Sequence, residues 1–141
     1  MKRSCMVMLA SLMLMPLLAE AQLSRLTVTV HGLVPATGTL EVSLFNSAET
    51  FMHQPFLQRS VPVAGKEEIT VEFAGMLEGE YAVVAVHDEN GNGLLDTGFL
   101  GFGGENFAYS NNAAAWLGRP DFEAARFTLG TDNLAIEIHL D

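Results

Sequence analysis

Residues 87–96 carry oxygen-bearing side chains whose spacing is typical of a cation-binding loop. The segment reads HDENGNGLLD and follows the apolar run YAVVAV. Calcium loops of the EF-hand type place oxygen ligands at positions one, three and five, a glycine at six, a backbone carbonyl at seven and an oxygen at nine. With Asp88 at position one, the predicted ligands are the side chains of Asp88, Asn90, Asn92 and Asp96 and the carbonyl group of Leu94.

The segment departs from the full calcium motif in ways that lower the expected affinity. Phe99 stands at position twelve, where the bidentate glutamate would be, although Glu89 and Glu105 are available as further ligands. With only two charged ligands, we expect binding in the range of about 10⁻⁴–10⁻³ M that is typical of extracellular calcium modules. The same residues also suit tight turns, in which Asp88 and Asp96 would cap backbone N–H groups. Both interpretations remain open from the sequence.

A different chemistry is conceivable at the same place. His87, Asp88 and Glu105 could form a small extracytoplasmic metal-dependent hydrolase if the three side chains converge in one pocket. However, a single histidine at a strand end is more often a hydrogen-bonded structural residue, and no second histidine stands at a ligand-like spacing from it. Ser110 lacks the G-x-S-x-G elbow of a nucleophile, so S-N-N at 110–112 is expected to be a turn whose side chains bond the backbone. The main expectation is therefore a non-enzymatic protein.

Short segments of strand character predict the elements that position these residues. Most show apolar residues at every second position, as in 134–140, where Ile136 and Ile138 are expected to face the core and Glu137 and His139 the solvent. The segment 81–87 is apolar on both faces, which places it in the middle of a sheet. The pattern predicts an all-β fold, a single seven-stranded β-sandwich of the immunoglobulin-like or transthyretin-like kind. The seven segments are 26–30, 39–46, 61–63 (a weak edge strand), 68–73, 81–87, 125–129 and 134–140.

A long connection, about 88–123, has weak patterning but many aromatic residues. Loops of this length in a compact domain are usually functional or disordered. Because disordered segments are poor in aromatic residues, we expect this one to be ordered and to pack against the sandwich. We therefore expect this connection to form the surface that binds a partner, which would be an unknown protein or a glycan.

The N-terminus has the features of a secretory signal peptide. Lys2 and Arg3 precede an apolar run, and Ala19-Glu20-Ala21 fits a cleavage site, so residues 1–21 are predicted to be removed and 22–141 to form the domain. Cys5, the only cysteine, would leave with this segment. The sequence thus predicts a periplasmic or secreted domain without disulfides and without membrane insertion after cleavage.

The charge of the chain argues against some classes of partner. Its formal net charge is −10, with 17 acidic residues against seven lysines and arginines. Nucleic acids and anionic lipids need a basic surface, so neither is expected as a partner.

Several short motifs resemble a family of exported bacterial proteins. They are L-x-x-G-x-Y (Leu77, Gly79, Tyr81), the HDENGNG core from His87, and F-x-Y-S-N-N from Phe107. This family is known as domain of unknown function twenty-one forty-one, and the resemblance covers roughly residues 38–140. It implies a secreted or periplasmic β-sandwich without an established activity. The L-x-x-G-x-Y turn is also similar to the strand entry of transthyretin-like and carboxypeptidase-regulatory-like modules, which are binding or structural units.

Overall fold

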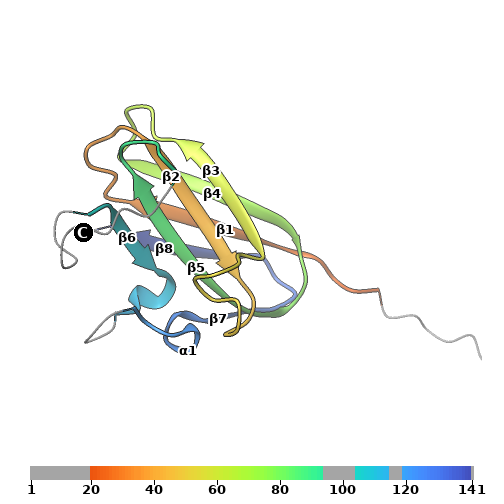
Figure 1. Ribbon diagram of the computed structural model, residues 1–141. Helices are drawn as coiled ribbons and strands as arrows, with labels where there is room; N and C mark the ends of the chain where they lie inside the picture. Colours follow the sequence, from red (N-terminus) through yellow and green to blue (C-terminus); the bar gives the residue numbers. More distant parts are fainter. Residues whose placement is uncertain (1–19, 94–103, 115–118, 141) are drawn as a thin grey trace, which may run out of the picture.

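The computed structural model describes residues 20–93, 104–114 and 119–140, and the chain forms two β-sheets packed face to face (Figure 1). Most of the predicted signal peptide, residues 1–19, lies outside the described residues. The elements are β1 (Ser24–His31), β2 (Thr39–Phe45), β3 (Leu57–Pro62), β4 (Glu68–Met76), β5 (Gly79–Asp88), β6 (Asn106–Tyr109), η2 (Ser110–Asn112), α1 (Phe122–Ala125), β7 (Phe127–Leu129) and β8 (Leu134–His139).

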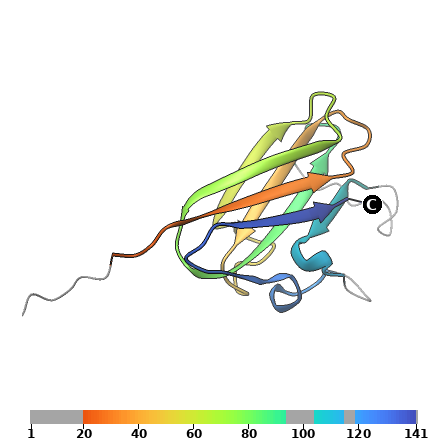
Figure 2. The same ribbon diagram turned by 180° about the vertical axis from the view of Figure 1, so that it is seen from behind.

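One sheet has three strands in the order β4-β1-β8. Seen from behind, β1 lies between β4 and β8 (Figure 2). Strand β1 pairs antiparallel with β4 and parallel with β8, so that His31 lies opposite His139 and Thr29 opposite Glu137. The alternation predicted for 134–140 is confirmed, since Ile138 is fully buried while Glu137 and His139 are exposed.

The second sheet has the order β3-β2-β5-β6, and β7 also pairs with β5. Strands β6 and β7 bind different parts of β5: β6 pairs with residues 84–87 and β7 with residues 79–81. The edge position predicted for the segment around Pro62 is confirmed, because β3 pairs with β2 at the end of this sheet. This strand begins earlier than predicted, at Leu57, because its pairing with β2 continues to Leu44.

The main core lies between the sheets and is built from the inward-facing alternate residues of both. Leu26, Val28 and Val30 from β1 meet Leu40, Val42 and Leu44 from β2, and all six are fully buried. Burial of each such side chain contributes about 1.5–3 kcal/mol, so this core stabilises the domain without disulfides.

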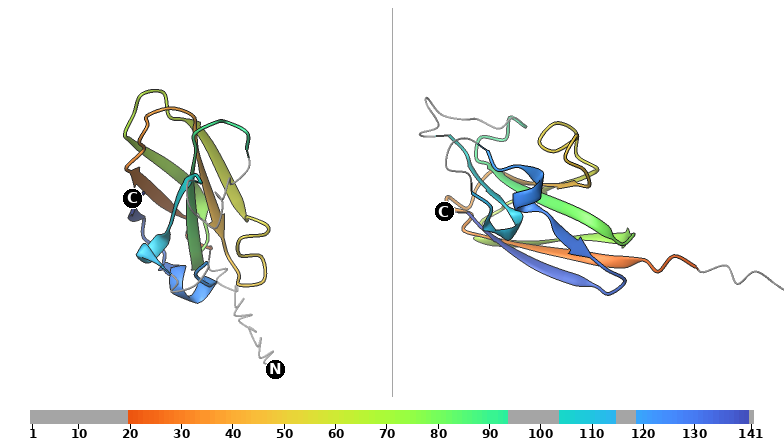
Figure 3. Two further views of the ribbon diagram at one scale, coloured as in Figure 1. Left: turned by 60° about the vertical axis from the view of Figure 1, so that its left-hand side comes forward. Right: turned by 90° about the horizontal axis from the view of Figure 1, so that it is seen from below.

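A second apolar cluster covers the other face of β5. Ala82 and Val84 point into it, and residues from β2, the connection after it, β6 and α1 complete it (Phe45, Phe51, Tyr109, Phe122 and Ala125). Figure 3 shows α1 and η2 side by side next to β5. The central position predicted for residues 81–87 is confirmed, because this strand is buried on both faces.

The long connection is ordered where the structure describes it. Contrary to the expectation from its weak patterning, it contains regular secondary structure. It contains β6, η2 and α1, and eight strands are present in the described residues where seven were predicted. The four residues of β6 are too few to show a pattern by themselves. They form a strand because the edge of β5 offers unpaired N–H and C=O groups along residues 84–87.

The L-x-x-G-x-Y motif forms the corner that leads into β5. The hydroxyl of Tyr81 donates to the carbonyl oxygen of Leu77 at 3.0 Å, which ties the strand to the turn before it. A Cβ added at Gly79 would lie 3.6 Å from the Tyr81 ring, so the glycine lies in contact with this side chain. Tyrosine corners of this kind occur in immunoglobulin-like sandwiches, where the tyrosine bonds to the backbone a few residues upstream.

Candidate functional site

The turn after β5 is organised by the carboxylate of Asp88. This side chain is only 2% exposed, and its two oxygens accept backbone hydrogen bonds from the turn. Oδ1 accepts from the N–H of Gly91 at 2.7 Å and of Asn92 at 3.2 Å, and Oδ2 accepts from the N–H of Gly93 at 2.7 Å. The chain therefore curls around a buried carboxylate, which is the capping role considered from the sequence.

A second predicted ligand oxygen lies beside the first. The Asn90 side-chain oxygen accepts from the N–H of Asn92 at 3.0 Å, and the same N–H contacts Asp88. Because one donor serves both oxygens, the side chains of Asp88 and Asn90 converge on the same side of the turn. Leu94 and Asp96, the other predicted ligands after Asn92, lie outside the described residues.

Glu105 brings a second buried carboxyl group to Asp88. Its side chain is 8% exposed and hydrogen-bonds to Asp88 from the segment just before β6. Burial raises the pKa of the Asp88 carboxyl, but the hydrogen bonds from Gly93, Glu105, Gly91 and Asn92 outweigh it and hold this pKa below its ordinary value. A hydrogen bond between two carboxyl groups requires one proton, which Asp88 and Glu105 share.

His87 lies next to Asp88 in sequence but on the opposite face of the sheet. Successive side chains of a strand point to opposite faces, and His87 shares its face with the core residues Val83 and Ala85. Its ring is fully buried, and Nε2 donates to the carbonyl oxygen of Thr37 at 2.7 Å. The hydrogen bond expected of this histidine is confirmed, and His87 and Asp88 do not converge as the hydrolase hypothesis requires.

The S-N-N segment is a turn whose side chains bond the backbone, as predicted. The Ser110 hydroxyl is buried; it accepts from the N–H of Val83 at 2.9 Å and donates to the carbonyl oxygen of Ala125. Asn111, at φ +60°, donates from its side-chain amide to the carbonyl oxygen of Arg126. The side chains of Ser110 and Asn111 thus tie β5 to the C-terminal end of α1 by hydrogen bonds to backbone groups.

A cluster that could hold a metal, and that the sequence analysis did not find, lies on the outer face of the three-stranded sheet. Within the described part of the chain, His31, Glu137 and His139 each place one ligand atom within 4.8 Å of the others. The outward alternation of residues 137 and 139 was visible in the sequence, but their pairing with β1 was not.

The two packed sheets define an all-β sandwich protein. Residues 28–137 match the family described as "Uncharacterized protein conserved in bacteria (DUF2141)", and the chain belongs to this family. No curated protein and no solved structure matches the chain. In the parts of the chain that are described, no helix has the length and apolar character that crossing a membrane requires.

Proposed function

We propose that this protein is an exported, non-enzymatic β-sandwich that binds or assembles with a partner at the cell envelope, and that calcium stabilises its 88–96 loop. The ligands would be the side chains of Asp88, Asn90, Asn92 and Asp96 with the carbonyl of Leu94. The observation that carries the proposal is the pair of buried carboxyl groups, Asp88 and Glu105, next to the oxygen of Asn90.

Two carboxyl groups side by side in a buried place cannot both be charged without compensation. They must share a proton or hold a cation. The proton between Asp88 and Glu105 marks the place that a calcium ion would take, and both carboxylates would then be ligands. Calcium binding would release this proton, so the affinity would rise with pH.

The positions of the polar residues support a non-enzymatic role. His87 and Asp88 point to opposite faces of the sheet, and Ser110 is enclosed by backbone groups of β5 and α1. A hydrolytic site needs a nucleophile and a base within reach of one substrate atom. These side chains instead bond the backbone. Asp88 and Ser110 hold the connection between β5 and β7 in place, and His87 bonds Thr37 in the connection before β2.

Thermal unfolding with calcium and with a chelator tests the ion. For a dissociation constant of about 1 mM, 10 mM calcium stabilises the folded state by about 1.4 kcal/mol. In a domain of this size, that raises the Tm by about 5 °C. An unchanged Tm at 10 mM calcium would remove the ion from the proposal.

Two variants test whether the calcium-dependent rise in Tm comes from the 88–96 loop. Asp96→Asn removes a charged predicted ligand and should abolish the calcium-dependent rise in Tm. Asp132→Asn removes the same charge from the exposed turn between β7 and β8 and should keep the full rise. An equal response of the two variants would mean that calcium acts on the surface charge as a whole.

Export is tested separately from calcium binding. Fractionation of the cells and N-terminal sequencing should find a protein outside the cytoplasm that begins at Gln22. The net charge of −10 favours a protein or glycan as partner over nucleic acid. A cytoplasmic protein with an intact N-terminus would contradict export.

A further inference from the structure

The parallel pairing of β1 and β8 brings two histidines and a glutamate together on the outer face of the sandwich. His31 is opposite His139, and Glu137 precedes His139 by two residues on the same face of β8. Their inward neighbours Val30 and Ile138 are fully buried, so the three polar side chains point away from the core. The register of the sheet thus fixes the positions of all three.

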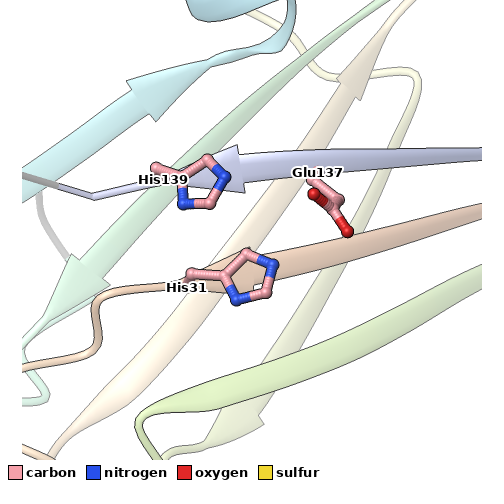
Figure 4. Close-up of side chains that lie close together, drawn as sticks. All are labelled: His31, Glu137 and His139. Atoms are coloured by element: carbon pink, nitrogen blue, oxygen red, sulfur yellow. The ribbon is translucent and has the colours of Figure 1, made fainter.

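The two imidazole rings lie one above the other. Their centroids are 4.6 Å apart and their planes differ by 12°. Figure 4 shows that both rings turn a nitrogen toward the side on which the Glu137 carboxylate lies. One ligand atom from each residue falls within 4.8 Å of the others.

We propose that His31, His139 and Glu137 bind a divalent transition metal ion, of the class of Zn²⁺ or Cu²⁺. Ligand atoms at about 2.1 Å from a tetrahedral ion lie about 3.4 Å apart. The ligand atoms of these three side chains lie within 4.8 Å of one another, so each pair needs to approach by at most about 1.4 Å. Glu137 and His139 are exposed and free to make this adjustment by rotation of their side chains. Three protein ligands leave at least one position for water or another ligand.

Glu68 on β4 prepares His31 for this role. Its carboxylate Oε2 lies 2.9 Å from Nδ1 of His31, which fixes the proton on Nδ1 and leaves the lone pair on Nε2. This Nε2 is covered and has no hydrogen-bond partner among the described residues. A carboxylate behind the histidine that binds the metal is the usual arrangement at zinc sites, where it orients the ring and raises its basicity. Glu68 is therefore a positioning residue.

The ligand types separate this site from the calcium loop. Two imidazole nitrogens with one carboxylate suit zinc, copper and nickel, whereas calcium requires six or more oxygens. The cluster draws on β1, β4 and β8, while the loop follows β5 in the other sheet. Each ion is expected to bind without the other.

Titration calorimetry of the purified protein with Zn²⁺ and with Cu²⁺ tests the proposal. We expect one site, with Cu²⁺ bound more tightly than Zn²⁺. His139→Ala and His31→Ala should each weaken binding at least tenfold. His53→Ala, in the exposed connection between β2 and β3, is the matched control and should leave it unchanged. Glu68→Gln should weaken it about 10- to 100-fold while all three ligands remain.

The imidazole NMR signals give a readout that does not depend on stability. Zn²⁺ should shift the ring signals of His31 and His139 and leave those of His53 and His87 in place. Far-ultraviolet circular dichroism without metal shows whether each variant is folded. Binding that survives in the folded His31→Ala/His139→Ala double variant would overturn the proposal, as would wild-type protein that binds neither ion. Asp96→Asn should bind Zn²⁺ normally, so failure of the calcium loop and failure of this site are distinguishable.

Discussion

Gly38 lies directly against the backbone of Asp88, the residue around which the polar turn is built. A Cβ at Gly38 would be 2.2 Å from the carbonyl oxygen of Asp88, and Gly38 has a φ of +79°. The connection before β2 and the turn after β5 thus pack so closely that a side chain does not fit between them.

Gly38→Ala should therefore destabilise the protein by about 2 kcal/mol or more, since it adds a backbone clash to the strain of a positive φ. Gly75→Ala is the matched control: Gly75 has a φ of +70°, but nothing lies within 4 Å of its added Cβ. It should cost only about 1 kcal/mol. Chemical denaturation measures both, and equal losses would contradict the close packing.

The two tyrosines of the domain should respond differently to loss of their hydroxyl groups. Tyr81→Phe removes the hydrogen bond to Leu77 at the entry of β5 and should cost about 1 kcal/mol. The buried hydroxyl of Tyr109 has no hydrogen-bond partner among the described residues, so Tyr109→Phe should be neutral or stabilising. Urea unfolding of the two variants gives the comparison. If Tyr109→Phe loses more stability than Tyr81→Phe, the Tyr109 hydroxyl has a hydrogen-bond partner outside the described residues.

Ser110→Ala should weaken the attachment of α1 to β5. The variant leaves the buried N–H of Val83 and the carbonyl oxygen of Ala125 without the serine hydroxyl. An unsatisfied buried group costs about 1–3 kcal/mol, which should appear as a lower Tm. Ser60→Ala removes an exposed hydroxyl that bonds Glu41 on the surface, and it should change stability by less than about 0.5 kcal/mol. Similar Tm values for the two variants would contradict a structural role of Ser110.

Glu80 should make the stability of the protein depend on pH in the acid range. Hydrogen bonds from the Thr128 hydroxyl at 2.7 Å and from Arg126 at 2.9 Å lower the pKa of its carboxyl below the ordinary value. A carboxyl with a lowered pKa in the folded state contributes stability above its unfolded pKa, and this contribution is lost as the pH falls through the folded pKa.

Glu80→Gln should therefore lower the Tm at pH 7, and the difference from wild type should shrink as the pH falls from about 5 to 3. Glu49→Gln, in the exposed part of the connection between β2 and β3, is the control and should show no such convergence. A difference for Glu80→Gln that stays constant down to pH 3 would exclude this carboxylate as the cause.

The alternation of apolar residues was enough to predict most strands, because each strand buries one face against a single core. Val28 and Val30 in β1, and Ile138 in β8, are buried as their period-two pattern predicts. The double-sided burial of β5 also followed from its sequence, since apolar residues occupy both sets of alternate positions. Among the strands of the described residues, β6 alone was missed, because its pairing depends on an edge that a distant segment provides.

The turn after β5 was predicted in part. The Asp88 carboxylate caps backbone N–H groups, as one of the two open interpretations expected, because the glycines and amides allow a tight turn around it; the calcium ligand set stays a prediction. That Glu105 reaches Asp88 depends on where β6 returns the chain to β5. The separation of His87 from Asp88 needed the orientation of the strand within the sandwich, although strand alternation already favoured it.

By itself, the sequence determined the class of fold, the central strand and the polar turn, because these depend on residues close together in the chain. Only the tertiary structure decided that His31 meets His139 and Glu137, since parallel strands far apart in sequence can pair in several registers. The physical reason is that local patterns specify which face of a strand is buried, whereas the packing of the whole core selects the partner strand and the register.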